Sequence, residues 1–246
     1  MNLHKLLLTK NNCYSIGKKL IPIGVMVHST GANNPYLRRY VQPDDGLLGQ
    51  NINGNHWNQP LPAGQQVCVH AFIGLLADGT VATYQTLPWD MRGWHCAGGP
   101  KGSGNDTHIG FEICEDNLTD PVYFAKVYRE AVELSAMLCQ VYGIKPEKPA
   151  LICHSEGYAL GIASNHSDVM HWLPRFGKSM DNFRADVKQA MTSPLAKTPE
   201  EVTIDNALAD GIITDRAHWL GVLTGTVAPN RSYIKLLIDN AHRQLT

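Results

Sequence analysis

Residues 24–30 have the sequence Gly-Val-Met-Val-His-Ser-Thr, a short apolar run that ends in a histidine, His28. Residues 150–156, Ala-Leu-Ile-Cys-His-Ser-Glu, repeat this pattern around His154. Apolar runs of this length are typical of strands buried inside a sheet, and the polar residue at the end marks the rim of that sheet. We therefore expect an α/β fold in which His28 and His154 stand at strand ends, where they can converge on one metal ion.

A third apolar run, Ile-Gly-Phe-Glu-Ile-Cys at residues 109–114, contains one carboxylate, Glu112. In an alternating strand, Glu112 lies on the same face as Gly110 and Cys114, and the residues between them face the other side. Because an unpaired carboxylate is costly to bury, we expect Glu112 to point toward the cleft. There it would serve as a general base. The alternative is an edge strand that leaves Glu112 in solvent.

Two histidines and one carboxylate, with a fourth position left for water, form a hydrolytic zinc site. His28 and His154 are the first two candidate ligands, although a single histidine at a strand end more often forms a structural hydrogen bond. The third ligand is open among Asp181, His166 and His171, which all lie downstream of His154. A helix N-cap is the competing role for Asp181.

Two further segments contain side chains suited to a cleft. Lys178, close to Asp181, would stabilise an oxyanion beside a metal, although a lysine is more often a solvated surface charge. Trp94 and His95 lie in a glycine-bearing loop, residues 92–99, where the indole can stack on a sugar or peptide and the imidazole can donate hydrogen bonds. We expect this loop to form a substrate-contacting lip.

The composition is that of a soluble globular protein. Of 246 residues, 43% are hydrophobic and 17% are charged, and the formal net charge is -1. This balance gives no basis for binding nucleic acid, and the apolar stretches are too short to cross a membrane. Six cysteines occur singly, which favours free thiols in a reducing compartment over disulfides. The apolar patch within residues 1–10 is too short for a signal peptide, so we expect synthesis in the cytoplasm.

Further segments complete an α/β domain that we place over residues 1–192. Residues 121–142 show a helical spacing of apolar side chains, with Pro121 in the first turn and Gly143 after the end. The remaining predicted elements are strands at 24–28, 108–114 and 150–153, a hairpin formed by 67–74 and 77–85 that turns at Asp78 and Gly79, and a helix over 181–191.

A polar, proline-bearing connector at residues 192–199 is the expected domain boundary. After it, residues 198–246 form a small all-helical C-terminal module. The patterns predict a helix that begins at 198–201 and ends at Gly211, a second helix around Trp219, and a third around 233–238. A module of this size has little core of its own, so we expect it to lean on a partner surface.

Five separated motifs resemble the zinc-dependent N-acetylmuramoyl-L-alanine amidases of the type 2 group, which is related to peptidoglycan recognition proteins. They are most similar to those of clostridial and prophage endolysins. The motifs lie at residues 26–30, 79–88, 93–95, 109–114 and 153–156, in the family's order. The resemblance implies a mixed central β-sheet flanked by helices and a Zn²⁺ cofactor. It also implies cleavage of the amide between N-acetylmuramic acid and the first L-alanine of the stem peptide in bacterial peptidoglycan.

The resemblance assigns zinc binding to His28 and His154. The family's third ligand is an Asp or Cys in a Lys-x-Asp/Cys setting, which favours Asp181, with Lys178 as the lysine that stabilises the oxyanion. Here two residues instead of one separate Lys178 from Asp181, so the spacing departs from the family's pattern.

The resemblance also implies that Glu112 moves the proton from the attacking water to the leaving nitrogen, and that His95 is a histidine of the cleft. Two rival functions are a non-catalytic peptidoglycan recognition protein and a zinc peptidase that cuts within the stem peptide. For residues 198–246 we hypothesise wall binding, with packing or dimerisation as the alternative. By analogy with endolysins, the protein would stay in the cytoplasm until a holin opens the membrane, and its oligomeric state is open.

Overall fold

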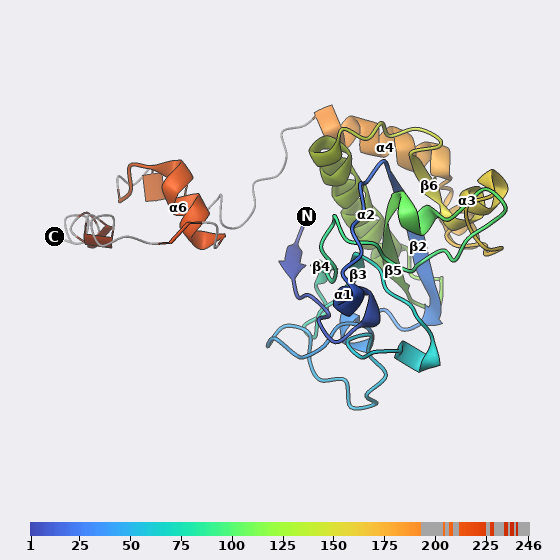
Figure 1. Cartoon of the computed structure of the whole chain (residues 1–246), viewed down its shortest axis with the longest axis horizontal. Coiled ribbons are helices and arrows are strands. Elements are labelled where there is room, and N and C mark those ends of the chain that lie inside the picture. Colours follow the sequence, from blue (N-terminus) through green and yellow to red (C-terminus); the bar gives the residue numbers. More distant parts are fainter. Residues whose placement is uncertain are drawn as a thin grey trace. The chain divides into compact units, whose positions relative to one another are not determined.

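The computed structural model describes residues 1–192, 204, 207–208, 212–224, 227–228, 234–235, 237–238 and 240. The chain divides into two compact units, Met1–Pro194 and Leu195–Thr246 (Figure 1). The larger unit contains the sheet and every residue that the sequence assigns to the cleft.

One six-stranded sheet organises the larger unit. The strands are β1 (Leu3–Lys5), β2 (Gly24–Asn33), β3 (Ala71–Leu75), β4 (Val81–Gln85), β5 (His108–Glu115) and β6 (Leu151–Cys153), in the order β1-β4-β3-β5-β2-β6. Strands β3 and β4 are antiparallel and are joined at the predicted turn, where Gly79 has a φ of 85°. The other neighbouring strands are parallel. The predicted mixed sheet is therefore confirmed.

The three apolar runs form adjacent strands. Strand β2 lies between β5 and β6 and is parallel to both, so the carboxyl ends of all three strands meet at one edge of the sheet. His28 stands opposite Glu112 of β5, and His154 directly follows β6. The expected end of β2 at His28 is too early, since the strand runs on to Asn33. The pairing of the strands nevertheless brings the three predicted side chains to one region.

Helix α2 (Pro121–Tyr142) packs on the sheet, and α4 (Met180–Thr192) packs on α2 (Figure 1). The carboxylate of Asp120 accepts hydrogen bonds from two amides of the first turn of α2, and Gly143 ends the helix in the left-handed conformation. The predicted bounds of α2 are confirmed. Helix α4 is one residue longer at each end than predicted.

Alternate residues of β5 face opposite sides of the sheet. Ile109, Phe111 and Ile113 belong to the apolar core that includes the buried face of α2. Glu112 faces the other side, where it lines a cavity. Strand β5 lies between β3 and β2, so the alternative of an edge strand with Glu112 in solvent is excluded.

The structure contains a disulfide that the sequence pattern did not predict. Cys13, in the short helix α1 (Asn12–Ile16), is bonded to Cys68, and their Cα atoms are 6.5 Å apart. The other four cysteines are buried free thiols, as expected. The expectation of no disulfide is wrong because the two partners are 55 positions apart and share no local motif, so only the tertiary fold brings them together.

The smaller unit contains helix α6 (Arg216–Leu223), which agrees with the predicted helix around Trp219. Asp215 caps this helix by accepting a hydrogen bond from the amide of His218. Trp219 is buried in a small apolar cluster together with Ile204 and Ile213.

Several predictions for the C-terminal part fall outside the described residues. These are the connector at 193–199, the start of the first helix at 198–201, its end at Gly211 and parts of the third helix around 233–238. None of the helices in the described part of the chain combines the length and the hydropathy needed to cross a membrane.

Candidate active site

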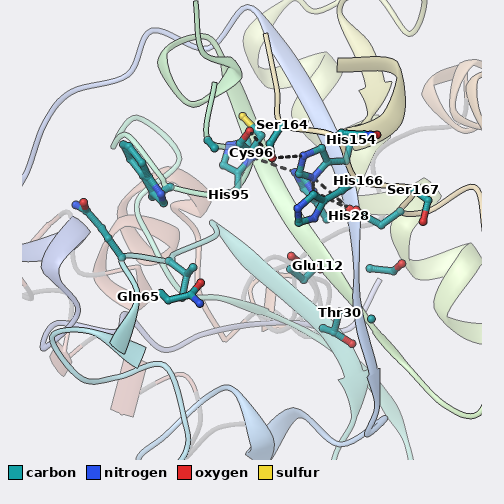
Figure 2. A pocket seen from close by; sticks show the side chains of 18 of the residues that line it. His28, Thr30, Gln65, His95, Cys96, Glu112, His154, Ser164, His166 and Ser167 are labelled. Atoms are coloured by element: carbon teal, nitrogen blue, oxygen red, sulfur yellow. Dashed lines mark hydrogen bonds and ion pairs between the residues drawn. The ribbon is translucent and has the colours of Figure 1, made fainter. Parts of the chain in front are cut away.

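A ring nitrogen of His28, a ring nitrogen of His154 and a carboxylate oxygen of Asp168 meet at the floor of the cleft. His28 Nδ1 lies 3.1 Å from His154 Nδ1 and 3.0 Å from Asp168 Oδ2. The third side of this triangle, from His154 Nδ1 to Asp168 Oδ2, measures 3.5 Å. Both histidines are buried, with exposed fractions of 1% and 3%. Figure 2 shows their two rings next to each other.

Three different segments supply these groups. His28 comes from β2, and His154 opens α3 (His154–Leu160) directly after β6. Asp168 lies in the loop between α3 and α4, and its backbone carbonyl accepts a hydrogen bond from the amide of Ser155 at 3.4 Å. This bond ties the loop to the first turn of α3 and thereby places the carboxylate against both imidazoles.

The donor set fits a zinc ion. The corners of a tetrahedron with metal–ligand bonds of about 2.0–2.1 Å are about 3.3–3.4 Å apart. The three distances between the donor atoms, 3.0, 3.1 and 3.5 Å, are close to that value. Burial, partly opposed by Asp168, lowers the pKa of His28, so its imidazole is neutral. Burial alone would raise the pKa of Asp168, but its contacts with His154 and His28 lower it overall, so the carboxylate is ionised.

His95, expected as a substrate contact, lies against His28. Its Nδ1 lies 3.0 Å from His28 Nε2, and its Nε2 lies 3.2 Å from the carbonyl oxygen of His108. Burial, and then the neighbouring His28 and His70, hold the pKa of His95 well below its ordinary value. The ring borders the cavity, but both of its nitrogens are engaged within the protein.

Glu112 is the carboxylic acid that faces the three ligand groups. It stands opposite His28 in the register of β2 and β5 and lines the same cavity. Its Oε2 is buried without a hydrogen-bond partner among the described residues. Burial, reinforced by the charges of Asp168 and Glu115, raises the pKa of Glu112 well above its ordinary value. A carboxyl group with these properties is suited to take up and release a proton during a reaction.

The ligand groups open into a cavity of about 920 Å³, a size that accommodates an extended polar substrate. Loops form its walls, at residues 65–67, 94–97 and 164–168. Trp57 and Trp94 add aromatic surface, so Trp94 lies where the sequence predicts a substrate contact. In the view of Figure 2, the rings of His28 and His154 lie above Glu112, and Gln65 lies to its left.

The structure does not bring Asp181 or Lys178 to the ligand groups, and neither residue lines the cavity. Asp181 lies in the first turn of α4, and its side chain is 91% exposed and bonded to Arg184 at 2.7 Å. Lys178 is paired with Asp186 at 2.9 Å. Asp168 takes the position expected for Asp181. The choice of Asp181 followed Lys178 although the spacing departs from the family's pattern, whereas the loop before α4 brings Asp168 against α3.

The two histidines considered as alternative ligands do lie at the cavity. His166 is exposed and stacks on His154, with ring centroids 4.7 Å apart, whereas His171 Nε2 is paired with Glu115 at 2.8 Å. Asp168 lies between them in the sequence. The signal for Asp168 was therefore present in the same polar segment, but imidazole is the commoner zinc ligand and the carboxylate between the histidines was passed over.

Comparisons with known proteins identify relatives of the larger unit. A family model described as N-acetylmuramoyl-L-alanine amidase matches residues 18–174. Endolysin PlyTW of Staphylococcus phage Twort is 28% identical over 137 residues, which are 56% of this chain and 25% of that protein. N-acetylmuramoyl-L-alanine amidase CwlH of Bacillus subtilis is 54% identical over 33 residues, 13% of each protein. The chain therefore spans a quarter or less of the length of these curated relatives.

A solved structure has the same fold. The crystal structure of the Staphylococcus aureus hydrolase AmiA in complex with its ligand matches with a TM-score of 0.52 and 19% identity, over 94% of this chain and 88% of that chain. The matched family segment, residues 18–174, is more than half of the chain and contains Glu112 and the three ligand groups. The chain belongs to the N-acetylmuramoyl-L-alanine amidase family.

Proposed function

We propose that the chain is a zinc-dependent amidase that hydrolyses the bond between N-acetylmuramic acid and the L-alanine of the stem peptide in bacterial peptidoglycan. The observation that carries the proposal is the meeting of His28, His154 and Asp168 beside Glu112 on the floor of one cavity. Membership of the amidase family and the similarity to a phage endolysin support the choice of bond and substrate.

His28, His154 and Asp168 would hold the ion. Zinc in such a site polarises a carbonyl group and lowers the pKa of a bound water. Glu112 takes the proton of the attacking water on its buried Oε2 and then delivers it to the leaving amide nitrogen. Its raised pKa suits the second step, because the carboxyl group has to keep the proton until the C–N bond breaks.

His166 replaces Lys178 as the group that stabilises negative charge on the carbonyl oxygen. Lys178 is held by Asp186, and the described lining of the cavity includes no lysine or arginine. His166 is exposed in that lining, and its ring is stacked on the ring of His154. From this place an imidazole can donate a hydrogen bond to an oxyanion that forms beside the ligand groups.

Digestion of purified peptidoglycan tests the proposed activity. Mass spectrometry should detect stem peptides that begin with a free L-alanine, together with glycan strands that keep their lactyl groups. Stem peptides cut internally would identify a zinc peptidase. A wall that stays intact in the presence of zinc would identify a non-catalytic recognition protein. Either of these two results contradicts the proposal.

The C-terminal unit is assigned to wall binding. Two exposed apolar side chains of this unit, Leu223 (50%) and Ile238 (61%), are available for contacts with the wall. In the full chain, Leu223→Glu combined with Ile238→Glu should reduce retention on purified walls and leave turnover of a soluble muramoyl-peptide unchanged. Val141→Glu, on the exposed side of α2 (60%), is the matched control. Unchanged retention with an altered oligomeric state would indicate dimerisation instead.

The protein is further assigned a place of action on the wall side of the membrane, which it reaches through a holin-type opening. Two observations support this assignment. The chain is similar to a phage endolysin, and the Cys13–Cys68 disulfide is of a kind that persists outside the reducing cytoplasm. Expression in bacteria with and without a holin tests it, and lysis in both cultures would contradict it.

A further inference from the structure

The imidazole of His95 fills a space beside His28 that two glycines leave open. A Cβ atom at Gly110 would lie 2.4 Å from His95 Cγ, and one at Gly93 would lie 3.1 Å from its Cδ2. The backbone amide of His95 donates to the side-chain oxygen of Asn105 at 2.7 Å. Strand β5, its own loop and His28 therefore fix the position of this ring.

The contacts of the ring determine which of its nitrogens carries a proton. The carbonyl oxygen of His108 can only accept, so the His95 Nε2 that lies 3.2 Å from it is the donor. A neutral imidazole has one N–H group, so His95 Nδ1 is an acceptor. The nitrogen that faces it at 3.0 Å, His28 Nε2, is then the donor of that hydrogen bond. This order of donors leaves His28 Nδ1 without a proton.

The unprotonated Nδ1 of His28 faces His154 and Asp168 at 3.1 and 3.0 Å. A metal binds the unprotonated nitrogen of a neutral imidazole, so this tautomer presents a lone pair to the ion. The opposite tautomer would place a proton on Nδ1, where it would bond to the carboxylate of Asp168. The tautomer of His28 therefore decides whether the three groups form a ligand set or a closed hydrogen bond.

We propose that His95 is a positioning residue that holds His28 in its Nε2–H tautomer and thereby prepares His28, His154 and Asp168 to bind zinc. His95 acts through His28. The contacts that it makes with its two ring nitrogens explain why it lies at the cavity without a nitrogen directed to a substrate. The inference rests on the metal site of the proposed function and does not depend on the bond that the enzyme cuts.

The second histidine ligand has a comparable arrangement. His154 Nε2 lies 3.3 Å from the hydroxyl oxygen of Ser164, which lies 3.4 Å from the carbonyl oxygen of Cys96 (Figure 2). Because the carbonyl accepts, the hydroxyl donates to it and accepts from His154, which leaves His154 Nδ1 free for the ion. His95 and Cys96 are consecutive residues, so one short loop segment orients both histidine ligands.

The first experiment uses the metal-free wild-type chain. Long-range ¹⁵N–¹H correlation spectra show which nitrogen of each histidine carries the proton. We expect both His28 and His95 in the Nε2–H form. A proton found mainly on Nδ1 of His28 would overturn the proposal, and this measurement requires no variant and no substrate.

The second experiment compares His95→Asn with His95→Leu. The two side chains have nearly the same shape, but only the asparagine keeps an acceptor close to the position of Nδ1. His95→Leu should weaken zinc binding by about 10–100-fold, the usual loss when the partner of a metal-binding histidine is removed. His95→Asn should retain most of the affinity. The zinc Kd is measured by competition with a chromophoric chelator, and His28 should show a mixture of tautomers in the leucine variant alone.

Two results would contradict the proposal: wild-type zinc affinity in His95→Leu, or equal losses in both variants. Unfolding curves of the metal-free variants confirm that both are folded, and if the leucine variant does not fold, the wild-type spectrum decides. No arm of the experiment measures hydrolysis. A chain that shows the expected tautomers and zinc affinities but leaves peptidoglycan uncut would contradict the proposed function and leave the role of His95 standing.

Discussion

The floor of the cleft and its walls are built in different ways. The floor consists of the parallel strands β2, β5 and β6, whose backbone hydrogen bonds fix the positions of His28 and Glu112 relative to each other. The walls are loops, which are held by side-chain bonds to the backbone, by one disulfide and by the contacts of Asp168. The groups that perform the reaction therefore depend on the sheet, whereas the third ligand and the substrate contacts depend on how loops fold.

Removal of the acid on the floor should have the largest effect. Glu112→Gln keeps the shape of the side chain but loses its ability to accept a proton. We expect turnover of purified peptidoglycan to fall by about 10²–10⁴-fold. The zinc content, measured by atomic absorption, should stay equal to that of the wild type. Full turnover in this variant would exclude Glu112 as the general base.

Loss of the proposed zinc ligand that comes from a loop of the cleft, Asp168, should have the next largest effect. Asp168→Asn removes the charge of a ligand, and we expect zinc affinity to fall by more than about 100-fold, beyond the loss caused by removing a partner of a ligand. Asp181→Asn is the control, because its side chain is 91% exposed and paired with Arg184. Chelator competition measures both. If Asp181→Asn lost zinc and Asp168→Asn kept it, Asp181 and not Asp168 would be the third ligand.

Reduction of the Cys13–Cys68 disulfide tests how much this bond stabilises the loops on one side of the cavity. The backbone of Cys68 is bonded to that of Trp94 in both directions, at 3.1 and 3.0 Å, so the bond to Cys13 anchors one side of the cavity. A reductant should lower the free energy of unfolding by about 2–4 kcal/mol. Denaturant titration measures this change. Cys13→Ser combined with Cys68→Ser is the control, because a reductant should have no effect on it.

The smallest effect is expected from a change in the ion pair of Arg184 and Glu156, which lies outside the cavity and holds β6 and α3 together. Arg184 donates to the carbonyl oxygen of Leu151 in β6 and to the carboxylate of Glu156 in α3. Burial raises the pKa of Glu156, but its bonds to Arg184 and Lys148 lower it overall. The stabilisation by this carboxylate is therefore complete above its unfolded pKa of about 4.3 and is lost as the pH falls through the lower folded value.

Glu156→Gln should thus reduce the free energy of unfolding by about 1–3 kcal/mol at neutral pH. As the pH falls through the lowered pKa of Glu156, the difference from the wild type should become much smaller, because the wild-type carboxylate becomes protonated. Glu147→Gln removes one partner of an exposed ion pair with Lys145, and its effect should stay between about 0 and 1 kcal/mol at every pH. A loss at neutral pH that persists in acid would contradict the assigned cause.

The contrast between floor and walls also explains what the sequence could predict. Apolar spacing and the end signals at Pro121 and Gly143 are local, so the bounds of α2 followed from the sequence. Alternation along β5 gave the direction of Glu112 for the same reason. The position of Asp168 and the disulfide depend on loops that return to distant parts of the chain, and sequence spacing does not encode such a path.

His28 and Glu112 are side by side on neighbouring parallel strands. Neighbouring strands are about 4.8 Å apart, so the backbone sets the spacing between ligand and acid. One residue inserted in β5 ahead of Glu112 would turn its side chain into the aromatic interior under α2. Insertions in the surrounding loops leave this spacing intact. Loops that do not contain Asp168 can therefore change the lining of the cavity while the spacing between His28 and Glu112 is retained.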